Sequence, residues 1–375
     1  MKTAQIVIIG GGLSGLYAAM LLERQRIDYV LLEARDTFGG RIVSTPPYAG
    51  TCTGSDLDRF DLGATWFWLT LQPQLSRLID ELGLDTFEQP ETGDMLIERS
   101  AHETPTRVRG YPSSPAAMRI AGGMGALVDA VQRQLDPARV LAGRRVTQLT
   151  QLTNSGPHVD VHTLDETGAP ASYRASHVLL AMPPRVAAST LTFSPPLPEA
   201  MTREWTSTGT WMAPHAKYVA IYSEPFWRGD GLSGEARSAA GPLAEIHDAS
   251  APRGHAALFG FLGIPAHVRD RIPDNSLRAH CRAQLVRLFG ASAAEPVTEL
   301  LKDWAKDPLT ATAADRTGAD HPIAPHPMPA DGAWAGRLIA IASEWSPRYA
   351  GYAAGALDAA SLGVTTLLQR LDKAR

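Results

Sequence analysis

The stretch Gln5–Arg41 constrains the fold of this chain more than any other part of its sequence. A run of β-branched residues, Ile6–Ile9, leads into glycines at positions 10, 12 and 15, which have the spacing G-x-G-x-x-G. An alanine- and leucine-rich run follows, and a second apolar run, Tyr29–Leu32, ends at Glu33. This order predicts strand, tight turn, helix and strand, which is the first βαβ unit of a dinucleotide-binding fold.

Each glycine of this turn has its own expected task. Gly10 permits the tight turn, Gly12 lets the backbone approach a pyrophosphate, and Gly15 lets the helix lie close to the strand. The helix begins at Leu13 and Ser14, and its N-terminus directs unpaired N–H groups and the positive end of the helix dipole at the phosphates.

Glu33 lies where a carboxylate can accept hydrogen bonds from both hydroxyls of an adenosine ribose. A carboxylate in this place repels a 2′-phosphate, which argues against NADP. A glycine-rich turn without a ligand is the alternative interpretation. We favour a dinucleotide site because strand, helix, second strand and acidic residue follow one another in register.

The residues after Glu33 add groups that suit a phosphate-bearing cofactor. Ala34 and Arg35 come next, and the adjacent glycines Gly39 and Gly40 allow another close approach of the backbone. Arg41 can bind phosphate oxygens as a forked donor.

Three segments together resemble the flavin amine oxidase family, which includes the monoamine and polyamine oxidases. They are GGGLSG at 10–15, LEARDTFGGR at 32–41 and DLGATW at 61–66, and the segment SEWSPRYAGYAAGAL at 343–357 continues the resemblance. The resemblance implies FAD as cofactor and oxidation of an amine C–N bond to an imine, which water hydrolyses to an aldehyde or ketone. O2 then reoxidises the flavin and gives H2O2. Two alternatives stay open: a carbon–carbon desaturase or porphyrinogen-type oxidase of the same superfamily, and a flavin-binding protein whose catalytic site has decayed.

The overall pattern predicts an α/β protein: a Rossmann-type FAD-binding lobe and an α+β substrate lobe with a mixed sheet and helices. We predict a discontinuous FAD-binding domain that comprises residues 1–75, 120–192 and 310–375. The predicted substrate domain comprises residues 76–119 and 193–309. Helical spacing predicts helices over Gln74–Leu84, Ala126–Leu135, Asn275–Phe289 and Gly355–Leu371. The Gly-, Ala- and Ser-rich segment Arg228–His255 indicates hairpin turns.

Three residues are candidates for catalysis, on the resemblance. Lys217 stands in HAKYVAIYSEPFW, which resembles the family segment whose lysine binds a water at flavin N5. A strand lysine that faces solvent is the alternative. Trp304, in KDWAKDP, is similar to the family tryptophan that packs beside the flavin, or is a core tryptophan. Tyr352, in YAGYAAGA, matches the aromatic residue that stands in front of the flavin face.

The resemblance also implies further cofactor contacts. It places the DLGATW turn at the flavin ring, Val146 beside the adenine through main-chain bonds, Glu344 near the ribityl–phosphate region, and a helix N-terminus at the flavin or the phosphates. The residues concerned are Gly63, Ala64, Thr65, Val146, Glu344, Gly355 and Ala356.

Trp66 and Trp68 are candidate walls of the substrate cavity, or packing residues between the lobes. Counting from Trp304 places Ala314 at the second aromatic position of the monoamine oxidase cage. The same count places Ala313 where those enzymes bind flavin through a cysteine, so we expect non-covalent FAD.

The missing ring and the short segment 85–119 predict a cavity that is more open, or closed by a partner chain. They also predict an amine larger than a simple arylethylamine. A free amino acid is disfavoured, although Arg185 and Arg348 stay open as carboxylate ligands.

Composition argues against several other classes of function. The formal net charge of −4 gives no general attraction to nucleic acid or to an anionic membrane. Cys52 and Cys281 have no disulfide or zinc spacing, and the histidines have no metal-ligand spacing, so we expect no metal and a cytoplasmic location. The apolar stretches are too short for a bilayer, and the early first strand leaves no room for a signal peptide. A homodimer is the default expectation for a soluble oligomer.

Overall fold

The computed structural model describes residues 1–48, 57–151, 158–317 and 321–373. The chain forms two compact units. Unit 1 comprises Met1–Arg41, Val128–Ala213 and Pro308–Arg375, and unit 2 comprises Ile42–Leu127 and Pro214–Asp307. Residues 42–75 thus belong to unit 2, whereas the sequence assigns them to FAD binding. Compactness and cofactor contact are different properties, so the functional bounds stay a prediction.

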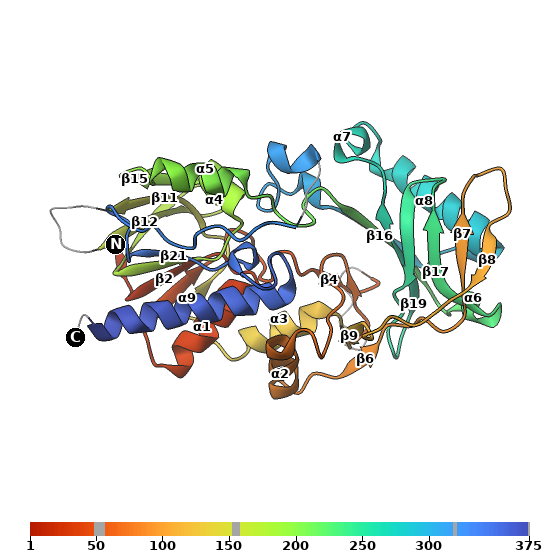
Figure 1. The fold of residues 1–375 in the computed structure, drawn as a ribbon, viewed down its shortest axis with the longest axis horizontal. Helices are drawn as coiled ribbons and strands as arrows, with labels where there is room; N and C mark the ends of the chain where they lie inside the picture. The colour runs from red at the N-terminus through yellow and green to blue at the C-terminus, as the bar shows by residue number, and fades with distance from the viewer. Residues whose placement is uncertain (49–56, 152–157, 318–320, 374–375) are drawn as a thin grey trace. The chain divides into compact units, whose positions relative to one another are not determined.

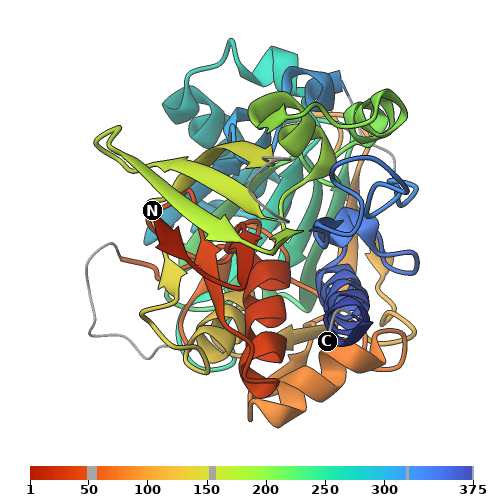
Figure 2. The same ribbon diagram turned by 90° about the vertical axis from the view of Figure 1, so that its left-hand side faces the viewer.

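Unit 1 is built on a parallel sheet in the order β10-β3-β2-β14-β21 (Figure 1). Its strands are β2 (Ile6–Ile9), β3 (Tyr29–Leu32), β10 (Val140–Leu141), β14 (His177–Leu180) and β21 (Leu338–Ala340). Strands β2, β3 and β14 are buried at every residue, which explains why their sequences are apolar except for His177. Helices α1 (Leu13–Arg24) and α9 (Ala353–Lys373) lie side by side in both views (Figures 1 and 2). The predicted βαβ unit and the α/β class are confirmed.

A second sheet packs within unit 1, in the order β1-β13-β12-β11-β15. Its strands are β1 (Lys2–Thr3), β11 (Arg145–Gln151), β12 (Val159–Leu164), β13 (Pro170–Ala175) and β15 (Thr192–Ser194). Val7 of the parallel sheet shares one core cluster with Leu149 and Val161 of this sheet and with Trp205. The remaining short helices of unit 1 are α4 (Pro184–Thr190), α5 (Glu199–Ser207), η3 (Ala313–Thr317) and η4 (Ser343–Trp345).

Unit 2 is built on a larger sheet in the order β20-β16-β19-β18-β17-β7-β8 (Figure 1). Its strands are β7 (Asp94–Glu98), β8 (Thr106–Arg109), β16 (Ala216–Tyr222), β17 (Leu232–Ser238), β18 (Leu243–Asp248), β19 (Ala256–Leu262) and β20 (Thr298–Asp303). Helix α8 (Asp274–Phe289) covers one face, where Leu277 and Leu285 pack against Tyr218. The other face carries Val219 and Phe259, which pack with Phe60 and Leu62 of the DLGATW region.

The shorter elements of unit 2 surround this sheet. They are β4 (Ser44–Thr45), β5 (Phe60–Asp61), β6 (Thr86–Glu88), β9 (Met118–Ile120), α2 (Pro73–Glu81), α6 (Phe226–Gly229), α7 (Ala266–Arg269), η1 (Ala291–Ala294) and η2 (Trp304–Lys306). Helix α3 (Met124–Gln132) begins in unit 2 and ends in unit 1. Among the helices of the described residues, none has the length and apolar character needed to cross a bilayer.

The four predicted helices are present as α2, α3, α8 and α9. The prediction of hairpin turns over Arg228–His255 agrees with the antiparallel strands β17 and β18, which follow the end of α6. One glycine of this segment serves packing. A Cβ at Gly234 would lie 2.8 Å from Nε1 of the buried Trp227, and its φ is +82°.

Candidate active site

The glycine turn after β2 fits a dinucleotide. Gly10 has φ +106°, and a Cβ there would lie 2.5 Å from the carbonyl oxygen of Ala181. A Cβ on Gly15 would lie 1.9 Å from the carbonyl oxygen of Gly10. Packing inside the protein therefore requires both glycines. Gly12 differs, since its Cβ would meet no protein atom closer than 3.8 Å and its φ is −71°. Its bare backbone thus leaves room for an external group such as a pyrophosphate.

The N-terminus of α1 has no side-chain cap and no acidic residue of its own. Gly12 is the N-cap residue. Gly12 forms a bridge with Gly39, and the loop Gly39–Gly40 packs against it, since a Cβ on Gly40 would lie 3.2 Å from the Cα of Gly12. The hydroxyl of Ser14 donates to the carbonyl of Ile341, so this predicted cofactor residue also fastens α1 to the chain after β21.

Glu33 lies buried at the end of β3, with 4% of its surface exposed. Its Oε2 accepts a hydrogen bond from the backbone N–H of Gly11 at 2.5 Å, and its Oε1 accepts one from the N–H of Arg35 at 2.8 Å. These bonds fix the carboxylate beside the glycine turn, and its oxygens keep further acceptor positions for a ribose. The sequence motif did not single out Gly11, although a Cβ there would lie 2.8 Å from the Cβ of Glu33.

Arg41, which is half-buried, forms an ion pair with the buried Glu344. Arg41 Nη1 lies 2.6 Å from Oε1 of Glu344, its Nη2 lies 2.9 Å from Oε2, and the Glu344 side chain is fully buried. Nη2 also donates to Ser343 Oγ at 3.0 Å. The sequence predicted both residues near the phosphates without pairing them. The pair lies beyond the carboxyl end of β21, where ligands bind in parallel sheets.

The other predicted contacts in unit 1 differ in character. Val146 is buried in the core, so only its main chain is available to a ligand. A Cβ on Gly355 would lie 2.0 Å from the carbonyl oxygen of Tyr349, so packing requires this glycine. Ala356 is buried in the first turn of α9, whereas Ala314 is exposed in η3.

Tyr352 belongs to an aromatic stack that the sequence analysis missed. The ring of His321 stacks on Trp211 with centroids 3.5 Å apart, and on Tyr352 with centroids 5.0 Å apart. The Tyr352 hydroxyl and His321 Nε2 lie 3.2 Å apart. Tyr352 keeps 38% of its surface exposed, so its ring can contact a ligand.

In unit 2, Lys217 is the central candidate. Its side chain is buried on β16, with 2% of the residue exposed. Nζ donates to Thr65 Oγ1 at 2.6 Å and approaches the carbonyl of Gly63 at 3.5 Å, so the DLGATW turn holds it. Nζ also lies 4.0 Å from the ring centroid of Phe259. Burial lowers the pKa of Lys217 to about 7, although the charge of Asp61 opposes this shift. The alternative of a solvent-facing lysine is thus wrong.

Trp304 packs against the same turn. It is 6% exposed, and its Nε1 donates to the carbonyl of Leu62 at 2.9 Å. The ammonium of Lys302 lies 4.5 Å from its ring centroid. Ala64, between the two residues that bind Lys217, is half-buried. Lys217, on β16, and Trp304, directly after the neighbouring strand β20, therefore support the same loop.

Asp61 stabilises the GGMG turn, residues 122–125, at which α3 begins. Its Oδ1 accepts the N–H of Met124 at 2.9 Å, and Ser44, which bonds to Asp61, accepts the N–H of Gly125 at 2.7 Å. A Cβ on Gly123 would lie 2.6 Å from Asp61 Oδ1. Burial raises the pKa of the Asp61 carboxyl. The start of DLGATW thus caps α3, and its end holds Lys217.

Trp66 packs on the sheet face that carries Lys217. Its ring lies edge-on to His247 with centroids 4.9 Å apart and tilted toward Phe259 at 5.4 Å, and its Nε1 donates to Gln89 at 2.8 Å. Trp68 is half-buried just before α2, where its main chain bonds to Gln72. The structure thus separates two tryptophans that the sequence grouped.

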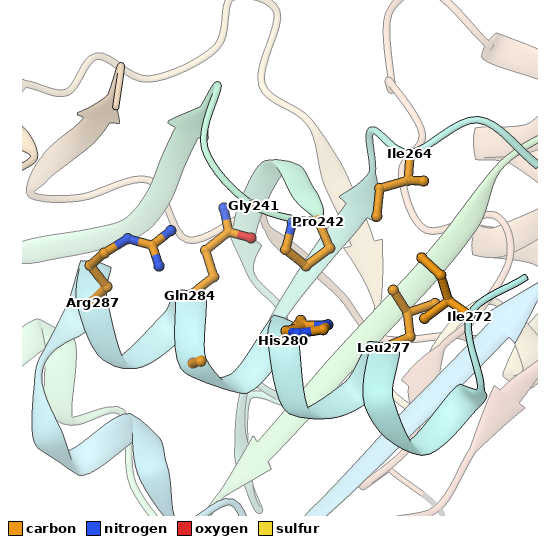
Figure 3. Close-up of a pocket in the computed structure, with 9 residues that line it drawn as sticks. Gly241, Pro242, Ile264, Ile272, Leu277, His280, Gln284 and Arg287 are labelled. Carbon is orange, nitrogen blue, oxygen red and sulfur yellow. The ribbon is translucent and has the colours of Figure 1, made fainter. Parts of the chain in front are cut away.

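Figure 3 shows a different pocket in unit 2, of about 330 Å³, beside α8. Ile264, Ile272 and Leu277 give it an apolar lining. Its Gln284 amide bonds to both backbone groups of Leu243, and its Arg287 pairs with Glu98. These polar groups are already engaged, and the residues predicted for the active site do not line this pocket.

Comparison with protein families decides the class of this protein. The model described as flavin containing amine oxidoreductase matches residues 98–364, and the one described as NAD(P)-binding Rossmann-like domain matches residues 8–82. The chain belongs to the flavin-containing amine oxidoreductase family. Its cofactor is FAD, and its reaction is the FAD-dependent oxidation of an amine.

Similar individual proteins agree with this assignment. The chain is 23% identical to the probable flavin-containing monoamine oxidase A of Dictyostelium discoideum, over 80% of this chain and 84% of that protein. It is 23% identical to flavin-containing amine oxidase B of Sus scrofa, over 98% and 86%. Cyclohexylamine oxidase from Brevibacterium oxydans has the same fold, with a TM-score of 0.79 at 18% identity over 98% of this chain and 99% of that one. A double mutant of putrescine oxidase gives a TM-score of 0.79 at 20% identity, over 98% and 100%.

Proposed function

We propose that Lys217, Trp304 and Tyr352 each act in catalysis in this amine oxidase. The observation that carries the proposal is the setting of Lys217. It is buried, yet among the described residues its hydrogen-bond partners are the hydroxyl of Thr65 and the carbonyl of Gly63 rather than a carboxylate. With a pKa near 7 it can donate or accept a hydrogen bond at neutral pH. Such a group suits the holding of a water or a polar ring atom.

Different residues of unit 1 would bind different parts of the cofactor. The backbone of Gly12 and the first turn of α1 would bind the pyrophosphate, Glu33 the adenosine ribose, and the Arg41–Glu344 pair the region near the phosphates. When bound, FAD accepts the two electrons of the amine oxidation and passes them to O2. The chain's own contribution is to orient the amine and exclude water.

We further propose that FAD binds without a covalent bond. Ala313 and Ala314 occupy the region where a cysteine would be needed. Cys281 is buried in α8, where burial raises the pKa of its thiol to about 12, so it is unreactive. Cys52 lies outside the described residues. Acid precipitation should leave the yellow chromophore in the supernatant, and colour retained in the pellet would contradict the proposal.

The proposed substrate is an aliphatic amine bulkier than a simple arylethylamine. Exposed Ala314 supplies a methyl group where the monoamine oxidases have a ring, and Trp66 is a candidate wall. The two arginines that stayed open for an amino acid carboxylate have partners of their own. Arg185 pairs with buried Asp315 at 2.5 Å, and Arg348 pairs with Asp358. The names of cyclohexylamine oxidase and putrescine oxidase also favour an alkyl or cycloalkyl amine.

The experiment is peroxide release from the purified yellow protein on addition of amines of graded size. We expect aliphatic amines to give H2O2 and Lys217→Met to slow flavin reduction by at least tenfold. Lys306→Met removes an exposed lysine of unit 2 that pairs with Asp274, and as the control it should change flavin reduction little. Reduction without peroxide in air would favour another acceptor. No flavin reduction by any amine would contradict the site assignment.

A homodimer and a cytoplasmic location complete the proposal. The dimer is the commonest state of soluble oligomers, and the cysteine spacing suits a reducing compartment. Light scattering of the holoenzyme and cell fractionation test these two points.

A further inference from the structure

Three aromatic rings of unit 1 form one continuous stack, although they come from three separate segments of the chain. Trp211 lies in the turn that follows α5, His321 in the proline-rich segment 321–332 before β21, and Tyr352 directly before α9. The Trp211 and His321 rings have centroids 3.5 Å apart and an interplanar angle of 20°. The His321 and Tyr352 rings have centroids 5.0 Å apart and an angle of 18°. The imidazole thus lies between the two larger rings.

His321 covers one face of the Tyr352 ring. A group inserted between two parallel rings must keep about 3.5–4 Å from each, so those rings would have to lie about 7 Å apart. The observed distance between the centroids is 5.0 Å, and the Tyr352 hydroxyl lies within hydrogen-bond distance of His321 Nε2, at 3.2 Å. Tyr352 nevertheless keeps 38% of its surface exposed. This accessible surface therefore belongs to the opposite face and the edges of the ring.

The backbone around Trp211 is strained and firmly held. Met212, the next residue, has φ +63°, which lies in the left-handed region that costs free energy for a residue other than glycine. Such a conformation persists where the surrounding structure determines it. Here the N–H of Thr210 donates to the buried Asp315 at 3.0 Å, and the N–H of Ala213 donates to the carbonyl of Thr210 at 3.1 Å. The turn therefore fixes the position of the indole.

Trp211 also packs on the backbone that carries Tyr352. Gly351 has φ +84°, and a Cβ there would lie 2.5 Å from the Cβ of Trp211, so the contact requires glycine. The N–H of Gly351 donates to the carbonyl of Ser343 at 3.1 Å. The carbonyl of Trp211 accepts a hydrogen bond from Arg41 Nη1 at 3.4 Å. The two outer rings of the stack are thus fixed relative to each other, and the imidazole fills the interval between them.

The imidazole of His321 therefore decides how much of the Tyr352 ring a ligand can reach. The face of a tyrosine ring offers apolar contact to an alkyl group and attracts an ammonium group. With His321 in the stack, one such face is available. His321 is itself exposed, whereas Trp211 is half-buried, so a substitution at His321 can uncover the second face without disturbing the fixed ends of the stack.

We propose that His321 is a specificity-determining residue of this amine oxidase. Backed by Trp211, it positions the Tyr352 ring and covers one of its faces, so that a bound amine contacts the opposite face and the edge. The imidazole thereby limits the width of the amine that is accepted beside Tyr352, and amines that are cyclic or branched at the carbon bearing nitrogen are restricted relative to linear ones. The inference rests on the proposed function, because Tyr352 must contact the amine.

The test compares cyclohexylamine with n-hexylamine on the holoenzyme, by kcat/KM and by anaerobic flavin reduction. His321→Ala should raise the ratio of kcat/KM for the cyclic amine to that for the linear amine by about fivefold or more, because the second ring face becomes accessible. His321→Phe keeps a flat ring in the stack and should keep this ratio within about twofold of the wild type. His321→Gln keeps a hydrogen-bonding group without a ring and should behave as His321→Ala.

His326→Ala is the matched control. It removes another exposed histidine of the same proline-rich segment, whose hydrogen-bond partner is Glu204, and it should leave the ratio unchanged. If His321→Phe behaved as His321→Ala while His321→Gln behaved as the wild type, the hydrogen bond rather than the ring would be decisive, and the inference would be overturned.

Replacing Tyr352 separates this inference from the proposed function. Tyr352→Leu should slow flavin reduction by both amines, and adding His321→Ala to it should no longer change the ratio, because the two residues in contact act together. If Tyr352→Leu slows reduction but His321→Ala leaves the ratio unchanged, His321 does not determine specificity and the proposed function remains. Equal losses for both amines in His321→Ala and His321→Phe would show a structural role and also overturn the inference.

A binding measurement covers the case in which no amine reduces the flavin and the proposed function fails. Perturbation of the flavin absorbance then gives the dissociation constant of each amine. A ratio of these constants that shifts toward the cyclic amine in His321→Ala, but not in His326→Ala, supports the role of His321 in binding. An unshifted ratio refutes it.

Discussion

The two sheets of this molecule provide functional groups in different ways. In the parallel sheet of unit 1, these groups follow the ends of strands: the glycine turn follows β2, Glu33 follows β3, and Glu344 follows β21. Many of them are backbone groups or positions without a side chain. In the sheet of unit 2, the groups are side chains within strands, such as Lys217 and Phe259, that share a face through register. Backbone groups at strand ends thus suit a cofactor whose structure is the same in every related enzyme. Side chains on a sheet face can be substituted without changing the fold, so they suit substrates that differ between enzymes.

The largest expected effects are on folding and on FAD content, and they differ between two glycines of the same turn. Gly15→Ala should prevent correct folding, because its Cβ would lie 1.9 Å from a backbone oxygen. Gly12→Ala should fold, since its Cβ meets no protein atom within 3.8 Å, but it should lose FAD. Soluble yield and bound flavin per chain measure the two effects. Equal flavin content in Gly12→Ala and wild type would show that no phosphate approaches this backbone.

The next effect concerns the carboxylate at the end of β3. Glu33→Ala should weaken FAD binding, since each hydrogen bond to a charged acceptor contributes about 1.5–3 kcal/mol. Glu33→Gln should weaken it less, because the amide oxygen still accepts. Fluorescence titration of the apoprotein with FAD gives both affinities. Unchanged affinity in both variants would place the ribose elsewhere.

The last effect concerns protein stability rather than cofactor binding, and it sharpens the account of the sheet face. Burial lowers the pKa of Lys217 from 10.5 to about 7, so between these pH values the unfolded chain keeps a proton that the folded chain has released. The free energy of unfolding of the wild type should therefore rise with pH in this window, relative to Lys217→Met. The variant should be the more stable protein below about pH 7, and its advantage should shrink toward pH 10.5. Urea unfolding across pH measures the difference, with Lys302→Met as the half-exposed control. A difference independent of pH would contradict a buried, proton-releasing lysine.

The dinucleotide-binding residues of the site were predictable from local sequence patterns. The tasks of Gly10, Gly15 and Glu33 depend on neighbours within one βαβ unit, and the sequence order contains that information. Lys217 was found through its resemblance to a family segment, and its burial then confirmed a position inside the protein rather than toward solvent.

The missed features depend on contacts between distant residues. Arg41 and Glu344 are 303 positions apart, so each was assigned to phosphate without its partner. His247 lies in a strand whose glycine- and alanine-rich surroundings indicated turns, and only strand register brings it to the sheet face that carries Lys217. Trp211 and His321 stack through loops that have no periodic pattern.

The three-segment construction of unit 1 also sets an order of events during synthesis. The residues of β2, β3 and β14 leave the ribosome early, but β21, Glu344 and α9 are made last, after the final segment of unit 2 has ended at Asp307. The carboxyl edge of the parallel sheet is therefore incomplete until translation is nearly finished. A chain that stops before Leu338 would carry β14 as an unpaired edge, which invites pairing with other chains. The Arg41–Glu344 pair is therefore expected to form only when synthesis is nearly complete, and truncated products are expected to be targets for proteolysis.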